Sequence, residues 1–202
     1  MLDILKQGGA TIIPLIIFSV ISLAISIERF IYLKKAKTNN YNLINKVRVK
    51  LDDNKVEEVE SILEDKTAPI AGILLEGLNY LGQEKEELRQ NLELIGSNQV
   101  KKLEKRLKAL NFIASVAPLL GLLGTVLGII DSFNILATAQ GVANPGALSV
   151  GIAQALISTA VGLIVAIPTM LMYSYLVSLV EKRTAEMNRW FADVVEVLGQ
   201  EG

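Results

Sequence analysis

The chain alternates between long apolar runs and charged segments. The first apolar run extends from Gly8 to Ile27 and is followed by Glu28 and Arg29. The second begins at Ala109, and from Ala109 to Val180 the only formally charged residue is Asp131. About 20 apolar residues cross a bilayer as a helix, and a charge inside hydrocarbon costs several kcal/mol. These runs therefore predict membrane-spanning helices.

A turn-forming cluster divides the second apolar stretch into two spans. Gly141, Asn144, Pro145 and Gly146 favour a turn, and the uncharged stretch is too long for one crossing. The third span then begins near Leu148 and is long enough, at roughly 1.5 Å per residue, to continue beyond the bilayer. We predict an all-α integral membrane protein with three transmembrane helices, of which the second and third extend into a helical cytoplasmic region.

Lys and Arg residues predict the orientation of the spans. They cluster after the first span, before the second and after the third, and none lies between the second and the third. By the positive-inside rule, residues 34–108 and 181–202 are cytoplasmic, whereas residues 1–7 and the loop at 132–147 are external. The spans are predicted at 8–33, 109–131 and 148–180, the last with a cytoplasmic extension.

The first cytoplasmic segment has a helical pattern. Short amphipathic helices are expected at 42–51, 56–63 and 69–81, packed on the stems of spans two and three. From Glu84 onward Leu and Ile recur at helical spacing, so we expect one uninterrupted helix from Glu84 into the second span. The apolar positions of residues 181–202 predict an amphipathic tail helix.

The composition narrows the chemistry. The chain contains no Cys and no His, which excludes disulfides, thiolate metal sites and the commonest general base. The net charge of −1 gives no sign of nucleic-acid binding. An enzyme would need a nucleophile with a base, or paired acids, at membrane depth, and Asp131 is the only acid there. We therefore expect no catalytic residue, no metal site and no cofactor.

Small residues recur at helical spacing along the second and third spans. Such residues let helix backbones approach closely in a membrane, so they are predicted to be packing positions. They include Gly121, Gly124 and Gly128 on the second span and Gly151 and Gly162 on the third. Four polar but uncharged side chains lie among them: Thr125, Gln154, Ser158 and Thr159. We call these small and polar residues of the second and third spans together the seam.

Two interpretations of the seam hydroxyls stay open from the residues alone. A Thr or Ser in a helix can satisfy the carbonyl four residues earlier and serve packing only. Alternatively, such helices repeated around an axis would line a pore or a socket with hydroxyls. Asp131 has two interpretations as well. It is either an interfacial residue at the outer end of span two, where charge is cheap, or a cation-attracting outer mouth.

Two motifs on the seam resemble those of a known family. The stretch Gly121-Leu-Leu-Gly-Thr-Val-Leu-Gly128, preceded by Ala117-Pro118, closely resembles the second-span motif of the MotA/TolQ/ExbB proton-channel family. The stretch Gly151-Ile-Ala-Gln-Ala-Leu-Ile-Ser-Thr-Ala-Val-Gly162 is similar to its third-span motif. Three spans make the chain closer to ExbB and TolQ than to a flagellar stator. Gln154 departs from the pattern, because ExbB and TolQ commonly have an acid there.

The resemblance implies a function and a set of partners. The chain would be a channel and stator subunit of the bacterial inner membrane, with a periplasmic N-terminus and a cytoplasmic C-terminus. It would couple proton flow to mechanical work, as in the ExbB-ExbD-TonB or TolQ-TolR-TolA systems. A homopentamer would hold an ExbD/TolR-like single-span protein in its pore and act on a TonB/TolA-like transducer.

The same resemblance implies roles for the polar seam residues. Thr125 and Thr159 would be the pore threonines, with Ser158 and Gln154 beside the ion pathway. The transported ion would be H⁺ or Na⁺, and the surrounding partner is membrane lipid. The alternative function is a structural membrane scaffold or a self-sufficient ion channel with no motor role.

Overall fold

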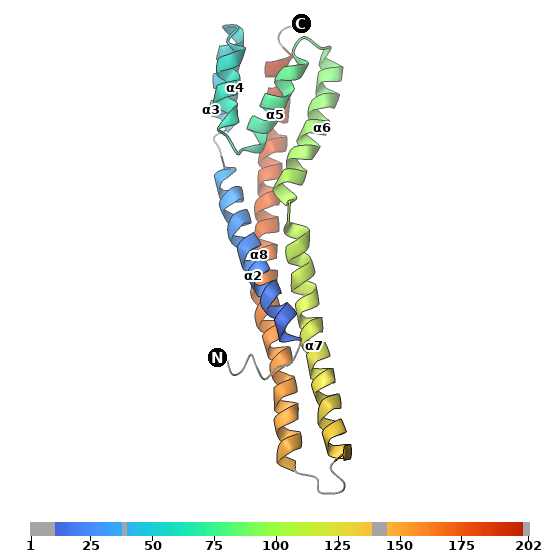
Figure 1. Ribbon diagram of the computed structural model, residues 1–202. Helices are drawn as coiled ribbons and strands as arrows, with labels where there is room; N and C mark the ends of the chain where they lie inside the picture. Colours follow the sequence, from blue (N-terminus) through green and yellow to red (C-terminus); the bar gives the residue numbers. More distant parts are fainter. Residues whose placement is uncertain (1–10, 38–39, 139–144, 200–202) are drawn as a thin grey trace. The chain divides into compact units, whose positions relative to one another are not determined.

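The computed structural model describes residues 11–37, 40–138 and 145–199, and within these ranges the chain consists of helices and the turns that join them (Figure 1). The helices are α2 (Ile12–Lys35), α3 (Asn40–Asp52), α4 (Val56–Glu64), α5 (Pro69–Gly77) with the short 3-10 helix η1 (Leu78–Tyr80), α6 (Lys85–Glu104), α7 (Leu107–Thr138) and α8 (Pro145–Leu198). Within the described ranges, three helical stretches are long and apolar enough to cross a membrane. The predicted all-α membrane protein is confirmed.

Helices α7 and α8 are longer than the second and third predicted spans. Helix α7 continues to Thr138, and α8 begins at Pro145, so most of the expected loop at 132–147 is helical. Pro145 and Gly146 belong to the first turn of α8 and not to a turn between helices, because Pro is well tolerated at the start of a helix. The remaining loop residues, 139–144, and the predicted external segment 1–7 lie outside the described residues.

The tail is not a helix of its own. Its described part, up to Leu198, is the end of α8, because no Gly or Pro follows Pro168 until Gly199. The prediction of one uninterrupted helix from Glu84 into the second span is wrong, because the structure has two helices there. Helix α6 ends at Glu104 and α7 begins at Leu107, with Arg106 between them at a left-handed φ of 67°.

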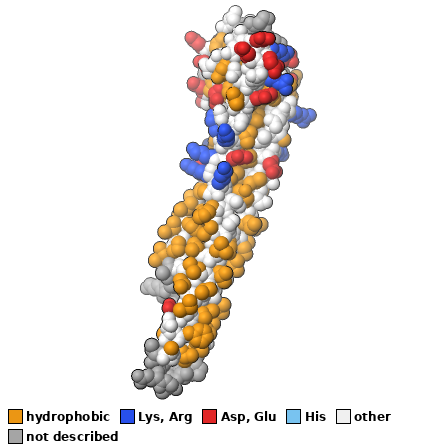
Figure 2. Space-filling model, turned by 90° about the vertical axis from the view of Figure 1, so that its right-hand side faces the viewer, with side chains coloured by type: hydrophobic (Ala, Val, Ile, Leu, Met, Phe, Trp, Pro, Cys, Tyr) orange, Lys and Arg blue, Asp and Glu red, His pale blue; other side chains and the backbone are white. Residues whose placement is uncertain are grey.

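The chain divides into two compact units, which we describe separately. Unit 1 comprises residues 1–27 and 106–174, and its described part holds α7 and the first parts of α2 and α8. Unit 2 comprises residues 28–105 and 175–202, and holds α3 to α6 and the last parts of α2 and α8. Figure 2 shows hydrophobic side chains over the visible face of unit 1, and charged side chains gathered on unit 2.

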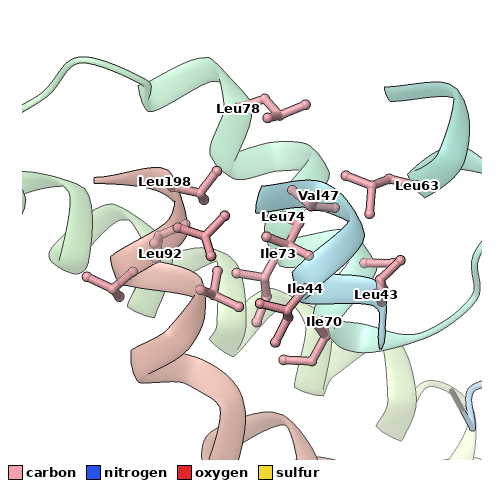
Figure 3. Close-up of a cluster of buried hydrophobic side chains, with 14 of the residues drawn as sticks. Leu43, Ile44, Val47, Leu63, Ile70, Ile73, Leu74, Leu78, Leu92 and Leu198 are labelled. Atoms are coloured by element: carbon pink, nitrogen blue, oxygen red, sulfur yellow. The ribbon is translucent and has the colours of Figure 1, made fainter. Parts of the chain in front are cut away.

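The core of unit 2 is centred on α5. Ile70, Ile73 and Leu74 of this helix are each no more than 1% exposed. Side chains from α3, α4, α6 and α8 point toward them in Figure 3, among them Val47, Leu63, Leu92 and Leu198. Full burial of one such side chain contributes about 1.5–3 kcal/mol. The short helices α3 to α5 therefore pack on α6 and on the last part of α8, close to the predicted arrangement.

Unit 1 has a smaller core in which α2 packs on α7 and α8. Leu15 of α2 is fully buried among Ile113 and Ala117 of α7 and Val165 and Ala166 of α8. The ring of Phe18 meets that of Phe112 edge-on, with 6.2 Å between centroids. These contacts hold the three apolar helices together beside the seam.

Candidate functional site

The backbones of α7 and α8 touch at the glycine positions of the seam. A Cβ added to Gly121 would lie 2.9 Å from the Ser158 carbonyl oxygen and 3.0 Å from the Cα of Thr159. A Cβ on Gly162 would lie 2.7 Å from the Ala117 carbonyl oxygen. No side chain fits at such distances, so only glycine permits this approach of the two helices.

Hydroxyl groups fill the spaces beside two other glycines. Gly124 faces the side chains of Ser158 and Thr11, and Gly151 faces the hydroxyl of Ser132. Ser132 donates to the Gly128 carbonyl oxygen at 2.8 Å. Neither Thr11 nor Ser132 was anticipated from the sequence. Ser132 could have been found, because it lies seven residues after Thr125 and therefore on the same face of α7.

The two seam threonines bond to the helices opposite them. The Thr125 hydroxyl lies 3.1 Å from the Ala155 carbonyl oxygen of α8, and the Thr159 hydroxyl lies 3.1 Å from the Gly121 carbonyl oxygen of α7. The two hydroxyls are also hydrogen-bonded to each other. Each hydroxyl has one hydrogen and two acceptor positions, so these contacts are alternatives between which the hydrogens can move.

Releasing either threonine from a carbonyl leaves no backbone group unsatisfied. Gly121 and Ala155 lie inside long helices, where the carbonyl oxygen already accepts the N–H of the residue four positions later. Both threonines are only half-buried in the single chain. No backbone acceptor therefore depends on either hydroxyl, and the Thr125 hydroxyl also lies 3.4 Å from the Gly121 carbonyl oxygen of its own helix.

The structure does not bring the other predicted polar residues to this pair's open side. Ser158 is 1% exposed and packs against Gly124, so its side chain is enclosed within the chain instead of lining an open surface. Gln154 is exposed, and its five-residue separation from Thr159 places the two about 140° apart around α8. The structure therefore groups Thr125 with Thr159 and leaves Gln154 on another face.

Asp131 lies inside α7, seven residues before this helix ends at Thr138. It is exposed, and the helix continues beyond it to Thr138. Its separation of six residues from Thr125 corresponds to about 9 Å along the helix axis and to a different face. Asp131 is therefore not part of the threonine pair.

The small-residue stripes of α7 and α8 are closed against each other within one chain. Gly121, Gly124 and Gly162 are buried in the isolated subunit. The antiparallel neighbour in the same chain therefore covers part of both stripes, whereas Gly128 and Gly151 stay half-buried. Large apolar side chains such as Leu119, Ile164 and Leu171 are the ones left exposed, at 63%, 69% and 67%.

Comparison with known proteins gives a family match. Residues 65–189 match the MotA/TolQ/ExbB proton channel family. An ExbB-like biopolymer transport protein of Synechocystis sp. is 33% identical over 165 residues, which cover 81% of this chain and 79% of the relative.

Two further relatives are a TolQ protein and an ExbB protein. The Tol-Pal system protein TolQ of Haemophilus influenzae is 32% identical over 176 residues, 82% of this chain and 77% of the relative. The biopolymer transport protein ExbB of Aquifex aeolicus is 48% identical over 83 residues, 41% of this chain and 55% of the relative. With the family match spanning both seam motifs, this chain belongs to the MotA/TolQ/ExbB proton channel family.

Proposed function

We propose that this chain is the channel and stator subunit of a motor in the bacterial inner membrane, where it couples proton flow to mechanical work on a partner. Family membership makes it a motor-associated proton channel subunit, related to ExbB and TolQ. The observation that carries the mechanism is the pair of Thr125 and Thr159 hydroxyls, which face each other across an uncharged seam.

The proton carrier at the seam is supplied by another chain. A proton crosses hydrocarbon only on a titratable group or along water, and Asp131 is the only carboxyl group between Ala109 and Val180. Asp131 lies away from the threonine pair. We assign the carrier to an Asp on the single helix of an ExbD/TolR-like partner, held in the pore of a homopentamer that acts on a TonB/TolA-like transducer.

The threonines would control the charge of that carboxyl group. When a hydroxyl hydrogen turns from the Ala155 carbonyl oxygen to the partner's carboxylate, it stabilises the charged form and lowers its pKa. A lysine would hold the carboxylate too tightly, whereas an alanine would leave it unsolvated and neutral. Neutral hydroxyls that have a second acceptor at hand let the carboxyl group gain and lose its proton repeatedly.

The test removes the hydroxyls one at a time. Thr125→Ala and Thr159→Ala are expected to assemble normally and to abolish energised function, while Thr→Ser at either position retains part of it. Thr169→Ala is the matched control, because this buried hydroxyl donates only to the Val165 carbonyl oxygen of its own helix, at 2.7 Å.

Assembly is read by native mass spectrometry, and function by restoration of the motor-dependent process in cells that lack their own subunit. Full activity of a variant with both Thr125→Ala and Thr159→Ala would show that the two threonines serve only in packing. That result would favour the scaffold, which transfers no ions. Ion conductance by the purified chain alone in liposomes would favour the self-sufficient channel. A subunit that stays monomeric in mild detergent would contradict the pentamer.

The proposed orientation has a direct test, because the chain contains no Cys. Lys37 and Gly146 are both exposed, so a single cysteine at either position should react with a soluble maleimide. We expect Cys at Lys37 to be labelled only from the cytoplasm and Cys at Gly146 only from the periplasm. Labelling of both positions from outside intact cells would contradict the proposed orientation, in which the loop at 132–147 is external and residues 34–108 are cytoplasmic.

We also propose that the chain carries no enzymatic activity and needs no cofactor. Its relatives are named as transport and Tol-Pal proteins and not as enzymes. The transported ion is proposed to be H⁺, with Na⁺ as the alternative. Replacement of Na⁺ by K⁺ in the medium separates the two, because only a Na⁺-driven motor would stop.

A further inference from the structure

Two aromatic rings, with the three lysines that follow them along α2 and α8, define a region of the surface of unit 2 that we call the basic patch: Phe30, Lys34 and Lys35 of α2, and Tyr175 and Lys182 of α8. The rings of Phe30 and Tyr175 lie with centroids 6.2 Å apart, so the two helices are neighbours at this level. The Lys34 ammonium lies 5.6 Å from the centre of the Phe30 ring. Lys182 follows Tyr175 by seven residues and therefore shares its face of α8.

The lysines of the patch have no carboxylate partner. Lys34, Lys35 and Lys182 are exposed, and none belongs to an ion pair within the described residues. The nearest carboxylates along the two helices do not neutralise them. Glu28 is held by Arg29 at 2.6 Å and Glu186 by Arg183 at 2.8 Å. Glu181 lies beside Lys182 in sequence but points about 100° away around α8.

Apolar surface leads directly into these charges. Ile31 is 47% exposed, and it lies one turn before Lys35 on the same face of α2. Tyr175 is 51% exposed and carries its polar group at the end of an apolar ring. An apolar stripe that ends in aromatic rings and then in cations is the pattern that proteins present to the boundary between hydrocarbon and headgroups.

We propose that the basic patch binds the phosphate of an anionic phospholipid headgroup, with the beginning of its acyl chains against Ile31. Lys34, Lys35 and Lys182 supply the charge, and the Tyr175 hydroxyl supplies a neutral donor. Charge complementarity selects the occupant, because unpaired ammonium groups beside exposed apolar surface match a lipid that is anionic at one end and apolar at the other. This inference rests on the placement of the chain in a membrane and not on ion transfer through the seam.

The experiment compares two sets of three charge removals in the full chain. The patch variant is K34Q/K35Q/K182Q, and the matched control is K46Q/K66Q/K85Q, whose lysines are exposed on unit 2 and belong to no ion pair among the residues that the structure describes. Each protein is incubated in mild detergent with equal amounts of phosphatidylglycerol and phosphatidylcholine. Native mass spectrometry then counts the lipids that remain bound.

We expect the wild type and the control to retain phosphatidylglycerol in preference to phosphatidylcholine, and the patch variant to lose that preference at least fivefold. One lysine at an anionic surface contributes about 1 kcal/mol, which corresponds to about fivefold in affinity. K34R/K35R/K182R keeps the charges and should keep the preference, which separates loss of charge from loss of fold. An equal loss in the control would overturn the proposal. An unchanged preference in the patch variant would also overturn it, and would leave an acidic protein segment as the partner of these lysines.

Discussion

Replacement of the buried arginine of α8 tests how unit 2 holds the end of α2. Arg183 is 6% exposed, and its Nε donates to the Leu33 carbonyl oxygen at 3.3 Å while its Nη1 donates to Glu186 at 2.8 Å. Leu33 lies in the last turn of α2, where carbonyl oxygens lack helical donors. The N–H of Lys37, which would have bonded to Leu33, bonds to the Lys34 carbonyl oxygen instead.

The two contacts contribute different amounts. A hydrogen bond that involves a charged group contributes about 1.5–3 kcal/mol, and here its loss leaves a helix-end acceptor without a partner. Rupture of a buried ion pair costs about 3–5 kcal/mol, but the side chain of Glu186 is 35% exposed and can be rehydrated. We therefore expect Arg183→Met to destabilise unit 2 by about 2–3 kcal/mol. Arg183→Lys should cost about half as much, because one ammonium reaches only one of the two acceptors well.

Thermal unfolding of the purified chain in detergent measures the effect. For a chain of this size about 1 kcal/mol lowers the Tm by roughly 2–4 °C, so Arg183→Met should lower it by about 5–10 °C. Arg189→Met is the control, because Arg189 is exposed on the same helix and belongs to no ion pair among the described residues. All variants are compared at one protein concentration, since oligomers unfold in a concentration-dependent way. Equal melting temperatures for the two Met variants would refute the reasoning.

Three further predictions concern single positions. Gly162→Ala should destabilise the α7–α8 contact by more than about 2 kcal/mol, whereas Gly96→Ala, whose Cβ would lie 3.7 Å from its nearest neighbour, should be neutral or stabilising in the same thermal assay. Arg106→Gly should be about 1 kcal/mol more stable than Arg106→Ala, because only Gly adopts a φ of 67° without strain, and a higher Tm for the Ala variant would contradict this. The hydrogen bond from Lys50 at 2.5 Å lowers the pKa of Glu58 below its ordinary value of 4.5, so its stabilising effect is present above pH 4.5 and is lost as the pH falls through the folded-state pKa. In Lys50→Gln, carboxyl NMR titration should find the pKa of Glu58 back near 4.5. An unchanged pKa would show that the hydrogen bond from Lys50 does not lower it.

The sequence alone determined the features that depend on local pattern. Hydropathy and helical spacing located the apolar helices and the short helices α3 to α5, because burial in lipid or in a core requires apolar side chains on a given face. The glycine and threonine positions of α7 and α8 were also readable, since close approach of two helices selects small residues at a helical period. The resemblance of the two seam motifs to known motifs then indicated the family.

Only the tertiary structure decided how these elements are joined and paired. The break at Lys105 and Arg106 has no Gly or Pro to announce it, so local propensity alone predicts a continuous helix there. The bonds of Thr125 and Thr159 to each other and to facing carbonyl oxygens depend on the axial register of α7 against α8, which no single helix encodes.

Long-range burial was likewise invisible in the sequence. Arg183 belongs to a run of charged residues that looks like a solvated helix face, yet it is buried against α2. Its partner is a backbone carbonyl oxygen 150 residues away. Backbone acceptors carry no residue-type signal, so only the packing of α8 on the end of α2 could select this arginine over its exposed neighbour Arg189.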